Sequence, residues 1–166
     1  MVAKAQIIVA GTGGQGVKSL ANILADLLIQ IKYDVTVLVN YDSASRGGTI
    51  FAYIVLDKVK ISNPIIDAAD FLLDLAVTPR TFASRQRIAQ TGVKPELPGD
   101  FYDFFGAGQK KFGREIYGNS IALGTLLAYL GADLKKFDLR AALPKKLPDD
   151  NVAAIAYGFS LKSKNK

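Results

Sequence analysis

The chain has no cysteine and no histidine among its 166 residues. Without cysteine it cannot form a disulfide, a thiolate metal site or the thiolate ligands of an iron–sulfur cluster. Without histidine it lacks the side chain that most often acts as a general base or metal ligand near neutral pH. We therefore assign no catalytic residue and no metal ligand to this chain. Any redox centre it works with is expected on a partner chain.

Long apolar runs are absent as well. The longest candidate, residues 121–132, contains glycine and is shorter than the roughly 20 residues that cross a bilayer. The opening stretch, MVAKAQIIVAG, carries one lysine and leads directly into an expected strand, so it lacks the length of a signal peptide. These features predict a cytoplasmic protein with no membrane partner.

The chain is basic, with 21 lysine and arginine residues against 15 acidic residues and a net charge of +6. Such a charge suits nucleic acid or phosphorylated ligands. Part of the excess lies in Lys162, Lys164 and Lys166, and terminal lysines of this kind are usually solvated. Because no basic helix with interleaved aromatic residues occurs, we predict that the chain does not bind nucleic acid. Its length and its 49% hydrophobic content predict a single domain over residues 1–166.

The first thirty residues have the most informative pattern. A short apolar run, residues 7–9, is followed by four glycines and then by apolar residues at helical spacing. This order predicts a buried parallel strand, a glycine turn and an amphipathic helix. Such a turn directs backbone N–H groups and a helix N-terminus at one point, which suits a phosphate or another anion. The alternative is that the glycines only permit a tight turn and a close contact between strand and helix.

Three of these glycines, spaced G-x-G-x-x-G, also fit the dinucleotide-binding fingerprint. A site of that class needs an acidic side chain at the end of the second strand to hold the ribose. The second expected strand, residues 35–39, ends at Asn40, and Asp42 already lies in the next loop. The sequence therefore argues against NAD, and a stand-alone nucleotide-binding oxidoreductase stays open only as an alternative.

A second motif follows that strand. Residues 41–48 form a loop of small and polar residues that contains Arg46, Gly47 and Gly48. In open α/β sheets, ligands bind at the carboxyl ends of strands, where this loop begins. A binding role for Arg46 is one interpretation, and an exposed arginine in a surface turn is the other.

These motifs and several shorter ones occur in the order found in one protein family. They are Gly-x-Gly-Gly-Gln-Gly at 11–16, Arg-Gly-Gly at 46–48, Asn-Pro at 63–64, Ala-Asp at 69–70, and Asn119 with Leu123-Gly124. Over about residues 5 to 130 the chain resembles the gamma subunit, or gamma domain, of the pyruvate and other 2-oxoacid:ferredoxin oxidoreductases.

The resemblance implies a subunit of an enzyme that converts a 2-oxoacid, coenzyme A and oxidised ferredoxin into acyl-CoA, carbon dioxide and reduced ferredoxin. Its implied partners are alpha, beta and ferredoxin-type (delta) subunits, which would hold the thiamine diphosphate and the iron–sulfur clusters. The chain itself would bind no cofactor covalently and would be inactive alone. It would help to hold coenzyme A as a cosubstrate, and a homodimer of the isolated chain is compatible with this role.

The expected binding residues are the glycine turn, whose N–H groups would face a phosphate or an acidic group of a partner, and the Arg46 loop, whose guanidinium would add a forked contact. They are Gly11, Gly13, Gly14, Gln15, Gly16, Arg46, Gly47 and Gly48. A purely structural subunit, in which these motifs only shape an interface, is the remaining alternative.

The rest of the pattern predicts an α/β fold with a doubly wound, mostly parallel, Rossmann-like sheet and helices on both faces. The second strand is rich in β-branched residues and is expected to be interior and parallel. Further strands are expected at 49–56 and 71–77, with a short hairpin strand at 59–61. Asp74, a polar residue in an apolar run, is expected to face a hydrogen-bond partner or a sheet edge.

Helices are expected in the second half of the chain. Thr78 and Pro79 are typical of a helix start, and Arg80, Arg85 and Arg87 would follow on its solvated face. Residues 92–118, rich in glycine, proline and aromatics, are too long for a plain loop and should include a short strand or a turn of helix. The other expected helices are at 119–130, 137–143 and 150–161.

Overall fold

The computed structural model describes residues 1–41, 48–66, 68–76, 82–145 and 148–164. The chain divides into two compact units. One is Ala3–Tyr102, which contains the sheet, and the other is Asp103–Lys166 together with Met1 and Val2, which is helical.

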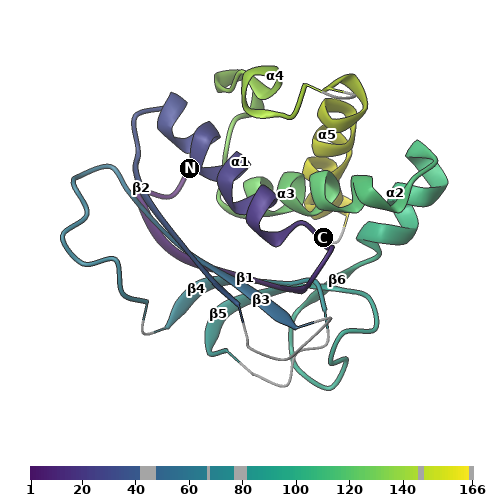
Figure 1. Cartoon of the computed structure of the whole chain (residues 1–166), viewed down its shortest axis with the longest axis horizontal. Coiled ribbons are helices and arrows are strands. Elements are labelled where there is room, and N and C mark those ends of the chain that lie inside the picture. Colours follow the sequence, from purple (N-terminus) through teal and green to yellow (C-terminus); the bar gives the residue numbers. More distant parts are fainter. Residues whose placement is uncertain (42–47, 67, 77–81, 146–147, 165–166) are drawn as a thin grey trace. The chain divides into compact units, whose positions relative to one another are not determined.

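The first unit is a six-stranded sheet with the order β2-β3-β1-β4-β5-β6 (Figure 1). β4, β5 and β6 each pair in parallel along the sheet from β1, whereas β3 is antiparallel to both of its neighbours, β1 and β2. The sheet is therefore mostly parallel, and the predicted α/β class is confirmed. The strands are β1 (Lys4–Thr12), β2 (Asp34–Tyr41), β3 (Thr49–Asp57), β4 (Ala69–Asp74), β5 (Ser84–Gln90) and β6 (Asp100–Tyr102).

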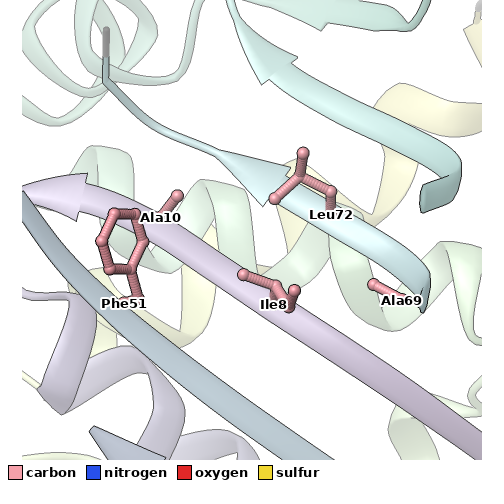
Figure 2. Packing of buried hydrophobic residues seen from close by; sticks show 5 residues of the cluster. All are labelled: Ile8, Ala10, Phe51, Ala69 and Leu72. Carbon is pink, nitrogen blue, oxygen red and sulfur yellow. The ribbon is translucent and has the colours of Figure 1, made fainter. Parts of the chain in front are cut away.

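Helix α1 (Val17–Gln30) packs on one face of the sheet, against β1, β2 and β3. Its buried side chains recur at three- and four-residue spacing, because only one stripe of a helix can face a sheet. These side chains are Val17, Leu20, Ala21, Leu24, Leu27 and Leu28. A second apolar cluster, which includes Ile8, Phe51 and Leu72 on three adjacent strands, is shown in Figure 2.

The prediction for the second strand is wrong in its placement. β2 is the edge strand, and it pairs antiparallel with β3. The predicted hairpin strand at 59–61 is also wrong, because no strand forms there and β3 itself is the antiparallel strand. The β-branched run of β2 suits a strand in either position, since its outer edge leaves several side chains only partly covered.

The helix expected after Thr78 and Pro79 is likewise not found among the described residues. Thr78, Pro79 and Arg80 lie outside them, and Arg85 and Arg87 lie on strand β5. Strand β4 ends at Asp74 rather than at residue 77. The error arose because the polar start of β5, Ser-Arg-Gln-Arg, looks like a solvated helix face when its pairing partner is unknown.

The second unit is built from helices. The predicted content of residues 92–118 is confirmed, since they include strand β6 and helix α2. The helix expected at 119–130 is also confirmed, although it begins at Gly118 with no side-chain cap. The helices are α2 (Phe104–Phe112), α3 (Gly118–Tyr129), α4 (Leu139–Ala142) and α5 (Pro148–Lys164), with short 3-10 turns η1 (Glu115–Tyr117) and η2 (Leu134–Lys136).

Helices α3 and α5 lie side by side and touch through their backbones (Figure 1). A Cβ atom at Gly124 would overlap the carbonyl group of Ile155, and one at Gly158 would overlap the carbonyl group of Ile121. The hydroxyl of Thr125 lies 2.9 Å from the Gly158 carbonyl oxygen. The two glycines therefore set the distance between the helices.

Candidate functional site

The predicted glycine turn joins β1 to α1. Gly14 (φ 89°) and Gly16 (φ 71°) both adopt left-handed backbone conformations, which favour glycine over any residue with a side chain. Gly16 occupies the N-cap position of α1, and no side chain of the described residues caps this end of the helix. An uncapped helix start of this kind suits an anion, and anion binding at this turn stays a prediction.

The glycines serve two different purposes. A Cβ atom at Gly11 would lie 2.5 Å from Cγ2 of Val17, so Gly11 permits the close contact between strand and helix. At Gly13 and Gly14 an added Cβ would meet no described atom within 4 Å. The interpretation of a simple close contact therefore fits Gly11, but packing within the described residues does not account for Gly13.

The side chain of Gln15 holds the turn in place. Its Oε1 accepts the N–H of Thr12 at 2.7 Å, and its Nε2 donates to the carbonyl oxygen of Leu75 at 3.1 Å. One side chain thus joins the end of β1, the start of α1 and the residue after β4. Sequence reasoning considered only the backbone N–H of Gln15 and missed this role. A polar side chain among four glycines was the signal that could have indicated it.

Two of the predicted N–H donors are used inside the chain. The Gly13 N–H donates to the Gly48 carbonyl oxygen at 3.2 Å, and the Gln15 N–H donates to the Thr12 carbonyl oxygen at 3.1 Å. This corrects the prediction that all four amide groups face a ligand. The remaining candidates are the N–H groups of Gly14 and Gly16, for which no partner is found among the described residues.

The Arg46 loop reaches the turn through its last residue. Because β3 runs antiparallel beside β1, Thr49 lies opposite Thr12, and Gly48 meets Gly13. Arg46 and Gly47 lie outside the described residues. The structure therefore brings Gly48 to the glycine turn, and the placement of the Arg46 guanidinium stays a prediction.

The strand order also bears on the dinucleotide alternative. In that class of site the strand next to the glycine turn carries the ribose-binding acid at its end. Here β3 lies between β1 and β2, so Asn40 at the end of β2 is one strand further away. NAD binding is therefore disfavoured for two reasons: Asn40 has an amide in place of an acidic side chain, and it lies on a strand that is not adjacent to the glycine turn.

Asp74 and Arg87 form a buried ion pair on β4 and β5. The Arg87 Nη2 and Nε atoms lie 2.9 Å and 3.1 Å from Oδ2 of Asp74. Both side chains are about 95% buried, with 6% and 4% exposed. The expectation that Asp74 faces a hydrogen-bond partner is confirmed, and the expectation that Arg87 is solvated is wrong. Burial raises the pKa of Asp74, although the hydrogen bond and the charge of Arg87 act to lower it.

The same guanidinium fixes the segment that follows β5. It donates to the carbonyl oxygens of Val93 at 2.7 Å and of Lys94 and Leu97, both at 3.3 Å. Arg87, held by Asp74, thus fixes residues 93–97 against the sheet.

The shorter motifs of the family pattern have local structural roles. Asn63 Oδ1 accepts the N–H of Ile65 at 3.0 Å and so closes the turn that contains Pro64. Asp70 Oδ2 accepts the N–H of Gln6 at 2.9 Å, which ties β4 to β1. Asp70 therefore joins two strands of the sheet, and Asn63 shapes the connection between β3 and β4.

Metal-binding and membrane-spanning features were also considered. In the described part of the chain no group of three or more acidic, histidine or cysteine side chains could hold a metal ion. No helix formed by the described residues has the length and apolar character needed to cross a bilayer. A cavity of about 470 Å³ runs along the first half of β5 and past residues 97–100, and no residue of the glycine turn lines it.

The sequence and fold of this chain match those of known proteins. Residues 6–94 match the family described as pyruvate ferredoxin/flavodoxin oxidoreductase. The chain belongs to this family. The resemblance seen in the sequence is thereby confirmed, and with it the assignment to a subunit of a 2-oxoacid:ferredoxin oxidoreductase.

Proteins of similar length resemble the chain over most of its residues. The chain is 27% identical to 2-oxoglutarate synthase subunit KorC of Archaeoglobus fulgidus, over 97% of this chain and 89% of that protein. Its fold matches the gamma subunit of keto/oxoacid ferredoxin oxidoreductase from Geobacter sulfurreducens with a TM-score of 0.71 and 19% identity, covering 96% of both chains. It also matches pyruvate oxidoreductase subunit PORC from Thermotoga maritima with a TM-score of 0.73 and 20% identity, covering 96% of this chain and 97% of that one.

A longer protein contains the same fold. The 2-oxoglutarate:ferredoxin oxidoreductase of Magnetococcus marinus, solved with 2-oxoglutarate, coenzyme A and succinyl-CoA bound, matches with a TM-score of 0.76 and 17% identity. The match covers 99% of this chain and 32% of that chain. The gamma-type fold therefore occurs both as a separate chain and as part of a larger one.

Proposed function

We propose that this subunit binds the phosphate groups of coenzyme A within a 2-oxoacid:ferredoxin oxidoreductase complex. The N–H groups of Gly14 and Gly16, the uncapped start of α1 and the guanidinium of Arg46 would form the binding surface. The observation that carries the proposal is that, among the described residues, no atom fills the space at Gly13 and Gly14 and no side chain caps the adjacent helix N-terminus. A phosphate is well suited to such a place, because the helix dipole and the free N–H groups both favour negative charge.

The chain's part in the reaction is to bind and to orient. Thiamine diphosphate and iron–sulfur clusters would supply the carbanion and electron-transfer chemistry, and this cysteine-free chain offers no cluster ligand. Gln15 would keep the turn rigid by holding Thr12 and Leu75. Arg46 would grip a phosphate of coenzyme A in a forked contact and so limit the positions open to the thiol end.

The partners and the setting follow the same proposal. We expect alpha, beta and delta-type subunits, and ferredoxin as the electron acceptor. The choice of 2-oxoacid would depend on residues of those partners. The cytoplasmic location indicated by the sequence stays a prediction.

Substitutions of Arg46 in the assembled complex test the ligand role. Arg46→Ala should raise the Michaelis constant for coenzyme A by an amount equal to about 1.5–3 kcal/mol, the usual worth of a hydrogen bond to a charged group. Arg46→Lys should also raise it, because an ammonium group cannot make the forked contact. The Michaelis constant for the oxoacid should not change. Arg85→Ala, which removes an arginine that is 87% exposed on β5, is the matched control.

The Arg46 variants also distinguish a role in binding coenzyme A from a role in assembling the complex. If Arg46→Ala dissociates the complex on gel filtration while residual complex has normal coenzyme A kinetics, Arg46 is an assembly residue and the ligand role is wrong. Gly13→Ala gives a second test, because its Cβ would enter the open space without meeting a described atom. It should leave the melting temperature unchanged and raise the Michaelis constant for coenzyme A. An unchanged constant would favour the structural-subunit alternative.

A further inference from the structure

The outer edge of β2 has no neighbouring strand among the described residues. β2 is the first strand in the sheet order, so only one of its two sides is paired with a described strand. An open edge presents a row of N–H and C=O groups that can pair with another strand. Sheets usually protect such edges with lysine, proline, a bulge or a very short strand. β2 is eight residues long, contains no lysine or proline, and pairs with β3 in an unbroken register.

Apolar side chains are exposed along this edge. Leu38 is 67% exposed and Tyr41 is 57% exposed. Leu38 lies opposite Tyr53 of β3 and on the same face of the sheet. Tyr53 packs against the cluster of Ile8, Phe51 and Leu72, which Figure 2 shows on the neighbouring strands. A strand added beyond β2 would therefore extend an existing apolar layer across Leu38.

The sequence of β2 matches itself when it is reversed about Leu38. Two copies related by a two-fold axis at this residue would place Leu38 opposite Leu38 and Val37 opposite Val39. The same register places Thr36 opposite Asn40 and Val35 opposite Tyr41. Apolar, β-branched and aromatic residues thus meet one another, and polar residues meet polar ones, which are the favourable cross-strand pairs. Shifting the axis to Val37 would put Thr36 opposite Leu38, a poorer match.

Charge favours the same partner. The chain carries a net charge of +6, so two copies repel each other overall. The seven residues that would pair, 35–41, contain no charged side chain. We propose that two copies of this chain associate through their β2 strands, antiparallel and centred on Leu38, to form one continuous sheet. Such a contact is isologous, because each copy offers the same surface.

The oligomeric state of the purified chain, residues 1–166, tests the proposal. Sedimentation equilibrium should show a dimer of the unmodified chain. Leu38→Lys should raise the dimer dissociation constant by about tenfold or more, because two ammonium groups would meet at the axis. Val59→Lys is the matched control, since Val59 is also 67% exposed but lies outside β2. It should leave the dissociation constant unchanged, and circular dichroism should show that both variants are folded.

Because the chain has no cysteine, an introduced thiol reports the register directly. Leu38→Cys should form an intermolecular disulfide under mild oxidation, since the two thiols would be adjacent at the axis. Thr36→Cys should not, because each thiol would lie opposite Asn40 of the other copy. A chain that stays monomeric at its highest soluble concentration overturns the proposal. So does a dimer that Leu38→Lys leaves intact, or a Thr36→Cys chain that cross-links as readily as Leu38→Cys.

Discussion

Two pairs of glycines, one pair in each unit, have opposite surroundings. In the sheet unit, Gly13 and Gly14 border space that no described residue fills within 4 Å. In the helical unit, Gly124 and Gly158 sit where the backbone of the facing helix leaves no room for even a methyl group. The same residue type therefore keeps a surface open in one unit and brings two helices together in the other. Glycine content alone does not distinguish a binding turn from a packing contact, but the surroundings of each Cβ position do.

The units also differ in what ties distant segments together. In the sheet unit, a buried ion pair and the Gln15 side chain join neighbouring strands. In the helical unit, side chains such as Tyr117 also join distant segments, but α3 and α5 in addition touch through their backbones. We therefore expect substitution of a buried charged residue to destabilise the sheet unit most. In the helical unit, we expect enlargement of a contact glycine to be the most destabilising change.

Removal of Arg87 should have the largest effect. Arg87→Met leaves the Asp74 carboxylate buried without its partner and should lower the free energy of unfolding at pH 7 by about 3–5 kcal/mol. Urea denaturation measures this loss. Arg85→Met on the same strand is the control, because Arg85 is 87% exposed and an exposed ion pair contributes about 0–1 kcal/mol.

The loss caused by Arg87→Met should depend on pH. Burial raises the pKa of Asp74, so the folded state binds a proton there more readily than the unfolded chain does. The stability that this protonated form contributes is present below the unfolded pKa and is lost as pH rises through the folded pKa. Without Arg87 the pKa of Asp74 rises further. The destabilisation should therefore be smaller in mildly acidic buffer than at pH 7, and an equal loss at both would contradict this account.

Enlarging a contact glycine should have the next largest effect. Gly124→Ala places a methyl group against the Ile155 carbonyl and should cost about 1–3 kcal/mol, the usual penalty for overpacking. Thermal unfolding followed by circular dichroism measures the change. Gly13→Ala, in the other unit, should shift the melting temperature little because its methyl group meets no described atom. Equal shifts in the two variants would remove the distinction between the two uses of glycine.

Lys162 should show the smallest effect. The sequence placed it in a solvated tail, but it lies on helix α5, with its Nζ 3.3 Å from the Ala128 carbonyl oxygen and 4.5 Å from the centre of the Tyr129 ring. Lys162→Ala should cost about 0.5–1 kcal/mol, the worth of a cation–π contact at an exposed site. Lys18→Ala on α1 is a suitable control, and a loss no greater than in that variant would mean that the tail is dispensable.

The parts of the fold that depend on neighbouring residues could be predicted from the sequence. The strand, turn and helix of the first thirty residues follow from spacing alone, and so does the end of α3 shortly before Gly131, where φ is 68°. Pairing between distant segments could not be predicted in this way. The edge position of β2 depends on where β3 returns beside β1, and that return leaves no local signal in β2 itself.

In the candidate site, too, local features could be predicted from the sequence and contacts between distant segments could not. The turn and its glycines were identified from their spacing, whereas two of their N–H groups are engaged by carbonyls that only the tertiary fold reveals. Arg87 was assigned to a solvated helix because its partner Asp74 is 13 positions away. Asp74 stood out in the sequence as a polar residue in an apolar strand. A search for an arginine or lysine able to pair with it would have led to Arg87.

The hydrogen bond from Gln15 to Leu75 has a consequence for the order of folding. These residues are 60 positions apart, so the bond can form only after β4 has docked beside β1. Contacts that close such long loops form late, because the chain must first lose the entropy of the intervening residues. The strand and helix on either side of the turn can form early from local interactions, but the turn acquires its final shape only when the centre of the sheet is assembled. A nascent chain shorter than about residue 75 would therefore carry the glycine sequence without the rigid turn.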